Sequence, residues 1–154
     1  MIGEGREDQK QNDLFFVCAL IEYIARKTKN RRSVVVNAIG KEGLKHIYDY
    51  ADVYHCENID KLSDEFISEY HIMEDSYDNV SKALYRIPTH WEIGKVYKRL
   101  TVDVASATGS NYIDALMLVF NSWIVEGIDN YNSSMFYESP HYLFESYKAG
   151  YALT

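Results

Sequence analysis

Residues 12–29, NDLFFVCALIEYIARKTK, contain the longest strongly apolar run of the chain and decide its fold class. Apolar residues recur here at the three- and four-residue spacing that places them on one face of a helix. They are Leu14, Val17, Ile21 and Ile24, and Phe16, Leu20 and Tyr23 widen the stripe. Coverage this broad predicts a central helix that is buried on more than one side. Asn12 or Asp13 is placed to cap its start.

The composition favours further helices. The chain has 154 residues, 47% of them hydrophobic and 25% charged, which is ordinary for one domain with one core. Only two prolines and eight glycines are present, whereas all-β folds need many turns and use more of both. The sequence therefore predicts an all-α fold, a compact bundle of about six or seven helices. Residues 12–154 are expected to form a single helical domain, and residues 1–11 a flexible tail.

Periodicity and cap residues place the other helices. The best local signal is Thr89-His90-Trp91-Glu92, which has the spacing of a capping box and predicts a helix that Gly109 closes. Ser139-Pro140 predicts the start of a last helix, which ends at Gly150. Other helices are expected over residues 44–54, 59–70, 79–87 and 111–126, with a loop over 71–78. Residues 34–39 are too short a run for periodicity to decide between helix and strand.

Charge is distributed unevenly along the chain. The net charge of −7 argues against a general nucleic-acid binder, because phosphate binding needs a basic field. Residues 46–78 hold ten acidic side chains and one basic one, Lys61, whereas residues 26–32 hold five basic side chains. Such polarity can steer a basic protein partner. The alternative is a solvated surface that only keeps the protein soluble.

Two groups of residues are candidates for partner binding. The acidic candidates are Asp49, Asp52, Asp60, Asp64, Glu65 and Glu69. The aromatic candidates lie near the C-terminus and are Tyr137, His141 and Tyr147. Tyrosine is enriched at binding hot spots, although aromatic residues of a last helix also serve as core.

Catalytic and metal-binding signatures are weak. His46, Asp49, Asp52, His55 and Cys56 could meet on a helix, but their spacing matches no metal motif, and an acidic outer helix face explains them as well. His55 and Cys56 are neighbours in sequence, so their side chains are expected to point apart. The sequence thus predicts no metal and no other cofactor. A small metal- or His/acid-dependent hydrolase or nuclease remains one alternative.

A helical DNA-binding regulator is a second alternative. Its contact residues would come from one short stretch and are Trp91, Lys95, Tyr97, Lys98 and Arg99. Only three of them are basic, so a solvated helix face accounts for them equally well.

Cellular context is predicted from cysteines and apolar runs. Cys18 and Cys56 are fewer than a small secreted scaffold would carry. The start MIGEGREDQKQN is too polar for a signal peptide, and the eight-residue run LFFVCALI is too short to cross a membrane. We therefore expect a cytoplasmic protein with reduced thiols and no membrane association.

The first half resembles a known family. The stretches FFVCALIEYIARK and LKHIYDYADVYHCENIDKLSDEFI are similar to small uncharacterised bacterial proteins often encoded beside putative toxins. The matching elements are Phe16, Cys18, Glu22, Tyr23, Tyr54, His55 and residues 59–67. The resemblance covers residues 14–68, and the second half has no counterpart. It implies an antitoxin-like or regulatory binding protein without catalytic residues, which agrees with the leading prediction of a non-enzymatic interaction protein.

Overall fold

The computed structural model describes residues 2–154, with side chains from Asp8 onward. The predicted all-α fold is confirmed, and the described residues contain no strand. The helices are α1 (Ile2–Thr28), α2 (Arg32–Asp49), α3 (Ala51–Tyr54), α4 (Ile59–Glu69), α5 (His90–Thr108), α6 (Tyr112–Phe120), α7 (Ile124–Ile128), the 3-10 turn η1 (Met135–Tyr137) and α8 (Pro140–Ala149). No described helix is both long and apolar enough to span a bilayer.

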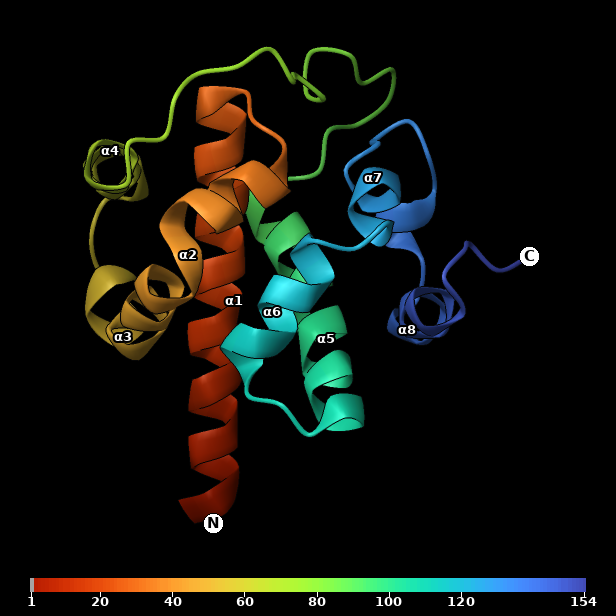
Figure 1. Cartoon of the computed structure of the whole chain (residues 1–154), viewed down its shortest axis with the longest axis horizontal. Coiled ribbons are helices and arrows are strands. Elements are labelled where there is room, and N and C mark those ends of the chain that lie inside the picture. The colour runs from red at the N-terminus through yellow and green to blue at the C-terminus, as the bar shows by residue number, and fades with distance from the viewer. Residues whose placement is uncertain (1) are drawn as a thin grey trace.

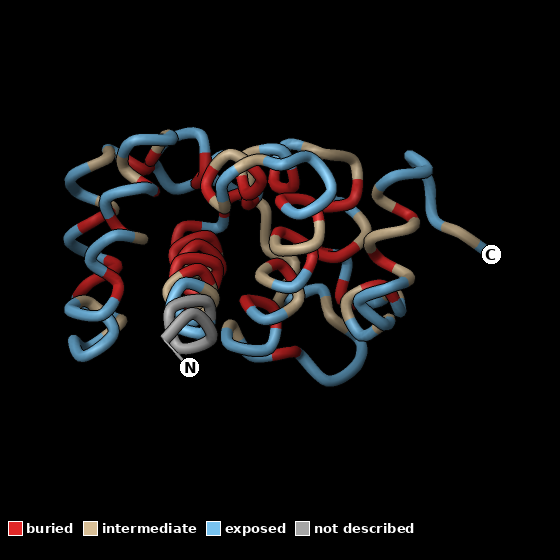
Figure 2. The backbone as a smooth tube through the Cα atoms, turned by 90° about the horizontal axis from the view of Figure 1, so that it is seen from below, coloured by how far each residue is buried: buried red, intermediate tan, exposed pale blue. Residues whose placement is uncertain are grey.

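Helix α1 forms the centre of the molecule, as its broad apolar coverage predicts. It packs most extensively against α5 and also contacts α2, α3 and α4 (Figure 1). Its buried stretch lies in the middle of the bundle (Figure 2). Gly94 allows α1 and α5 to approach closely, because a Cβ atom there would lie 2.8 Å from the Cα atom of Ala19.

The start of α1 differs from the prediction. The helix begins at Ile2, so residues 2–11, expected to be a tail, are helical, and neither Asn12 nor Asp13 is an N-cap. Gln9 donates a side-chain hydrogen bond of 2.8 Å to Asp13, four residues later. That spacing suits the interior of a helix, since residues i and i+4 are neighbours there. Met1 lies outside the described residues.

The region after α1 is helical throughout. Residues 34–39 belong to α2, which kinks at Gly40, where φ is 77° and ψ is 166°. The helix expected over 44–54 is divided at Tyr50, which leaves helical geometry with φ −109° and ψ 17°. Helix α4 follows the predicted range 59–70 closely, and residues 71–78 form the expected loop.

The helix predicted over residues 79–87 is absent. The side chain of Asn132, which is distant in sequence, binds backbone groups of this segment. It accepts a hydrogen bond from the Leu84 N–H (2.7 Å) and donates one to the Lys82 carbonyl (3.1 Å). Asn79 donates to the Asp129 carbonyl (2.8 Å). These bonds replace the i to i−4 bonds that a helix would supply. The segment therefore runs irregularly, with Leu84 78% exposed.

The helix expected over 111–126 is also interrupted. Asn111, where the expected range begins, caps α6, but the helix ends at Phe120 and α7 follows after a short break. Asn121 forms this break because its side chain donates to the Met117 carbonyl and exchanges hydrogen bonds with Asn37 on α2. An asparagine that satisfies carbonyls through its side chain competes with helix continuation.

The capping signals at α5 and α8 are confirmed. Thr89 accepts a hydrogen bond from the Glu92 N–H (3.0 Å), and Glu92 accepts one from the Thr89 N–H (3.3 Å). Gly109 and Gly150 take left-handed geometry at the ends of α5 and α8, where glycine is favoured. Ser139 caps α8, with Pro140 in its first turn.

Loss of the α5 cap should lower stability measurably. We expect Thr89→Ala to reduce the free energy of unfolding by about 1 kcal/mol, the usual cost of an unsatisfied N-terminal N–H group. Urea denaturation followed by circular dichroism measures it. Ser106→Ala, at an exposed position of the same helix, should not lower the midpoint, because alanine favours the helix interior. A Thr89→Ala midpoint no lower than that of the wild type would show that the capping box does not contribute to stability.

Candidate functional site

The predicted acidic candidates all lie exposed on the side of the molecule formed by α3, α4 and the end of α2 (Figure 1). The structure divides them into two groups. Asp60 and Asp64 on α4 form ion pairs with Lys27 on α1 at 2.8 and 2.6 Å. Asp49 pairs with Lys45 one helical turn earlier at 2.7 Å. The charges of these three carboxylates are therefore compensated within the chain.

The second group has no such compensation. Among the described side chains, no cation forms an ion pair with Asp52, Glu57, Glu65 or Glu69. Burial and then the charges of Glu69, Glu57 and Glu65 raise the pKa of Tyr54, which places these three carboxylates around one phenol. Glu57 was counted in the acidic run but was not among the candidates, and the structure adds it.

Aromatic side chains lie among these carboxylates. The rings of His46 and Tyr50 are 4.8 Å apart, those of Tyr54 and Phe66 are 5.3 Å apart, and those of Phe66 and Tyr70 are 6.1 Å apart. Tyr50 and Val53 are 52% and 55% exposed. We call this surface the α3–α4 face. It consists of Tyr50, Val53, Tyr54, Glu57, Glu65, Glu69 and Tyr70, whereas the charge of Asp52 acts on Asp13 of α1.

The C-terminal candidates lie elsewhere. Tyr137 is 69% exposed on η1, His141 is exposed on α8, and Tyr147 is half-buried against the core. Helix α8 lies on the opposite side of α1 from α3 and α4 (Figures 1 and 2). The acidic and aromatic candidates therefore do not form one site.

The histidines of the first half make local contacts. His46 Nε2 lies 3.0 Å from the Tyr54 hydroxyl, and His55 Nδ1 lies 3.0 Å from the Ala51 carbonyl. His55 Nε2 and Cys56 Sγ approach to 3.7 Å, so the expectation that these neighbours point apart is wrong. The pair lies where α3 has ended, and the turn brings the side chains together. Within the described part of the chain, no three His, Cys, Asp or Glu side chains are placed to hold a metal ion.

The basic residues of α5 form a small patch. Lys95 and Arg99 are exposed, and Lys98 is half-buried. Burial and then the charges of Arg99 and Lys95 lower the pKa of Lys98. Tyr97, grouped with them from sequence, is fully buried and points into the core, so it is not available to nucleic acid.

The most extensive polar arrangement was not singled out from the sequence. Glu22 on α1, fully buried, accepts hydrogen bonds from Arg32 Nε (2.8 Å) and Arg32 Nη2 (2.6 Å) at the start of α2. Arg26 Nε (2.6 Å) and the Tyr131 hydroxyl also donate to it. A single carboxylate within the apolar run of α1 was the available signal, because an unpaired charge there would be very costly.

A second buried carboxylate completes this group. Asp129, at the end of α7, accepts a hydrogen bond from the Tyr97 hydroxyl at 2.6 Å and has its Oδ2 3.8 Å from Arg32 Nε. We call the set the buried ionic cluster. Its members are Glu22, Arg26, Arg32, Tyr97, Asp129 and Tyr131. They come from α1, α2, α5 and the segment after α7, so the cluster joins elements far apart in sequence.

The two carboxylates of the cluster differ in protonation. Burial alone would raise the pKa of Glu22, but Arg32 and Arg26 outweigh it and hold that pKa at about 2. Burial raises the pKa of Asp129 to about 7, only partly opposed by Arg32 and reinforced by the charge of Glu22. Glu22 is therefore the charged partner of Arg32, and Asp129 carries a proton below neutral pH.

Asp129 gives a pH dependence of known sign. Its pKa is higher in the folded than in the unfolded state, so the folded state binds the proton more tightly, and stability falls as pH rises from about 4 to 7. Asp129→Asn removes this titration while keeping an acceptor for Tyr97. The free energy of unfolding of the variant, relative to that of the wild type, should therefore increase as the pH rises from 5 to 8. Urea titrations at each pH measure the difference, with the exposed Asp52→Asn as control. Parallel curves for Asp129→Asn and wild type would contradict the assignment.

Comparison of the chain with protein-family models, with curated proteins and with solved structures finds no match. The function is therefore argued from the geometry and charge of the chain's own side chains.

Proposed function

We propose that the chain is a non-enzymatic interaction protein, of the antitoxin or inhibitor type, that binds a basic segment of a protein partner through the α3–α4 face. One observation carries the proposal: Tyr50 and Val53 are exposed, and Glu57, Glu65 and Glu69 act together on the neighbouring Tyr54 without forming an ion pair with any described side chain, although Lys61 lines the same hollow as Glu57 and Glu65. The resemblance of residues 14–68 to proteins encoded beside putative toxins supports the same class.

The chemistry of this face suits lysine and arginine side chains. The charges of Glu69, Glu57 and Glu65 all act on Tyr54, so a cation bound near this residue is attracted by negative charge and can contact an aromatic ring. The aliphatic stem of a lysine or arginine can cover exposed apolar surface such as Val53. Ion pairs give orientation and a fast association rate, while the aromatic contacts give affinity.

The face is held rigidly enough to serve as a preformed surface. Lys27 on α1 donates to the Asp60 carbonyl (3.0 Å) and to Ser63 Oγ (3.1 Å), besides its two ion pairs with α4. Tyr23 on the same helix donates to Asp60 at 2.8 Å. Helix α4 is thereby attached to the central helix. Because a preorganised surface loses less conformational entropy on binding, this attachment favours affinity.

Neutralising the uncompensated carboxylates should weaken partner binding selectively. In a pull-down from cells of the source organism, we expect wild-type bait to retain a basic protein that Glu57→Gln/Glu65→Gln/Glu69→Gln bait loses. With the purified partner, the affinity of the triple variant should fall by at least about tenfold, chiefly through slower association, because long-range attraction acts on the on-rate. Its stability should change little, since exposed charges contribute little to folding.

The matched control removes the same three charges elsewhere. Asp8→Asn/Glu42→Gln/Glu138→Gln should bind like the wild type, because these residues lie outside the α3–α4 face. Raising the salt concentration should slow the association of the partner with the wild type and with the control. The Debye length is about 8 Å at physiological salt and becomes shorter as salt is added, so the long-range attraction is screened. A partner that is bound equally by both triple variants, with no dependence on salt, would refute the proposal.

A further inference from the structure

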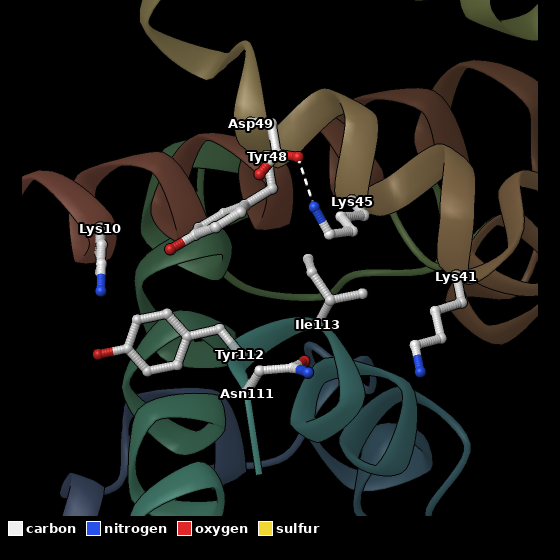
Figure 3. Close-up of a pocket in the computed structure, with 8 residues that line it drawn as sticks. All are labelled: Lys10, Lys41, Lys45, Tyr48, Asp49, Asn111, Tyr112 and Ile113. Carbon is white, nitrogen blue, oxygen red and sulfur yellow. Dashed lines mark hydrogen bonds and ion pairs between the residues drawn. The ribbon is translucent and has the colours of Figure 1, made fainter.

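A pocket of about 620 Å³ opens between α1, the second half of α2 and the start of α6. Its volume falls in the range of pockets that hold small-molecule ligands. Figure 3 shows Lys10 approaching it from α1, Lys41 and Lys45 from α2, and Tyr112 from α6. The pocket is separate from the buried ionic cluster.

The charge of this pocket contrasts with that of the protein. The chain carries a net charge of −7, yet the described ionisable groups that line the pocket are mainly cationic: three lysines and Asp49. Lys45 pairs with Asp49, and Lys41 pairs with Asp114 on α6, both at 2.7 Å. These lysines are 64% and 59% exposed. Exposed pairs contribute at most about 1 kcal/mol, so an anion of higher charge can replace the aspartates as partner.

The remaining walls are aromatic and apolar. Tyr48 from α2 and Tyr112 from α6 meet edge to face, with ring centroids 6.4 Å apart and planes at 89°. Ile113 adds an aliphatic surface between the tyrosines and the two lysines of α2, whereas Lys10 lies on the other side of the tyrosines (Figure 3). Such walls accommodate a planar ring, because ring systems stack on or meet tyrosine edges favourably.

We propose that this pocket binds a small organic phosphate with a planar ring, a ligand of the mononucleotide class. Lys41 and Lys45, one turn apart on α2, supply point charges for a phosphate dianion, and charge-assisted hydrogen bonds to phosphate are the strong ones. Lys10, at the other end of the pocket, adds to the positive field (Figure 3). The tyrosines and Ile113 receive the ring. One phosphate needs only a local set of cations, whereas a polymeric nucleic acid needs an extended basic surface, which a net charge of −7 disfavours.

Calorimetric titration of the full chain tests the proposal directly. The probes are the four common ribonucleoside monophosphates, with inorganic phosphate and the corresponding nucleosides titrated separately. At least one monophosphate should bind with a Kd below about 1 mM. Phosphate alone and nucleoside alone should bind at least about tenfold more weakly, because each engages only half of the pocket.

Two variants assign the binding to the pocket. In Lys10→Gln/Lys41→Gln/Lys45→Gln, the Kd for the monophosphate should rise at least about tenfold, because charge-assisted hydrogen bonds are lost. The control Lys61→Gln/Lys82→Gln/Lys95→Gln removes the same charge from exposed positions outside the pocket and should bind like the wild type. All substituted residues are exposed, and circular dichroism verifies the fold.

Three results would overturn the proposal. The first is that no monophosphate binds with a Kd below about 1 mM. The second is equal weakening by both triple variants, which would show general electrostatic attraction. The third is inorganic phosphate binding as tightly as the monophosphates, which would leave the aromatic walls without a role.

Discussion

The buried pairing of Glu22 with Arg32 is the interaction on which the rest of the structure depends. Two side chains without solvent exposure form a bidentate ion pair, and Arg26 and Tyr131 complete the coordination of the carboxylate. Charges so placed are tolerated only when they are fully satisfied, because desolvating them is costly. The pair therefore fixes the position of the start of α2 relative to α1. Through Tyr131 it also fixes where the segment after α7 packs against α1.

That constraint connects the core to the surfaces that carry the proposals. Helix α1 holds Glu22 on its buried side and, within two turns, Tyr23 and Lys27, which attach α4. Helix α2 begins at Arg32 and ends in the residues that lead into the α3–α4 face. The cluster thus fixes the first half of α2 against α1, and the kink at Gly40 then sets the direction of the second half, which carries Lys41 and Lys45 and leads to the α3–α4 face.

The sequence predicts those features that depend on local signals. The all-α class, the broad burial of α1 and the capping box at Thr89 follow from periodicity and cap chemistry, which act within a few residues. The absence of a helix over 79–87 could not be predicted, since distant Asn132 takes its backbone groups. The candidate site shows the same limit. The exposure of the acids follows from their pattern, and the Lys45–Asp49 pair lies within one helical turn. The pairing of Asp60 and Asp64 could not be predicted, because it depends on Lys27, which is distant in sequence.

The most direct test of this account is the stability of Glu22→Gln, measured by urea denaturation at neutral pH against the exposed control Glu42→Gln. The substitution keeps the shape of the side chain but removes the bidentate charged partner of Arg32, which leaves only Asp129, with its Oδ2 3.8 Å from Arg32 Nε, as a carboxylate near the buried guanidinium. The account predicts a loss of about 3–5 kcal/mol in the free energy of unfolding, the usual effect of removing one partner of a buried pair. The control should lose almost nothing. A loss below about 1 kcal/mol for Glu22→Gln, the size expected of an exposed pair, would contradict the central role of the cluster.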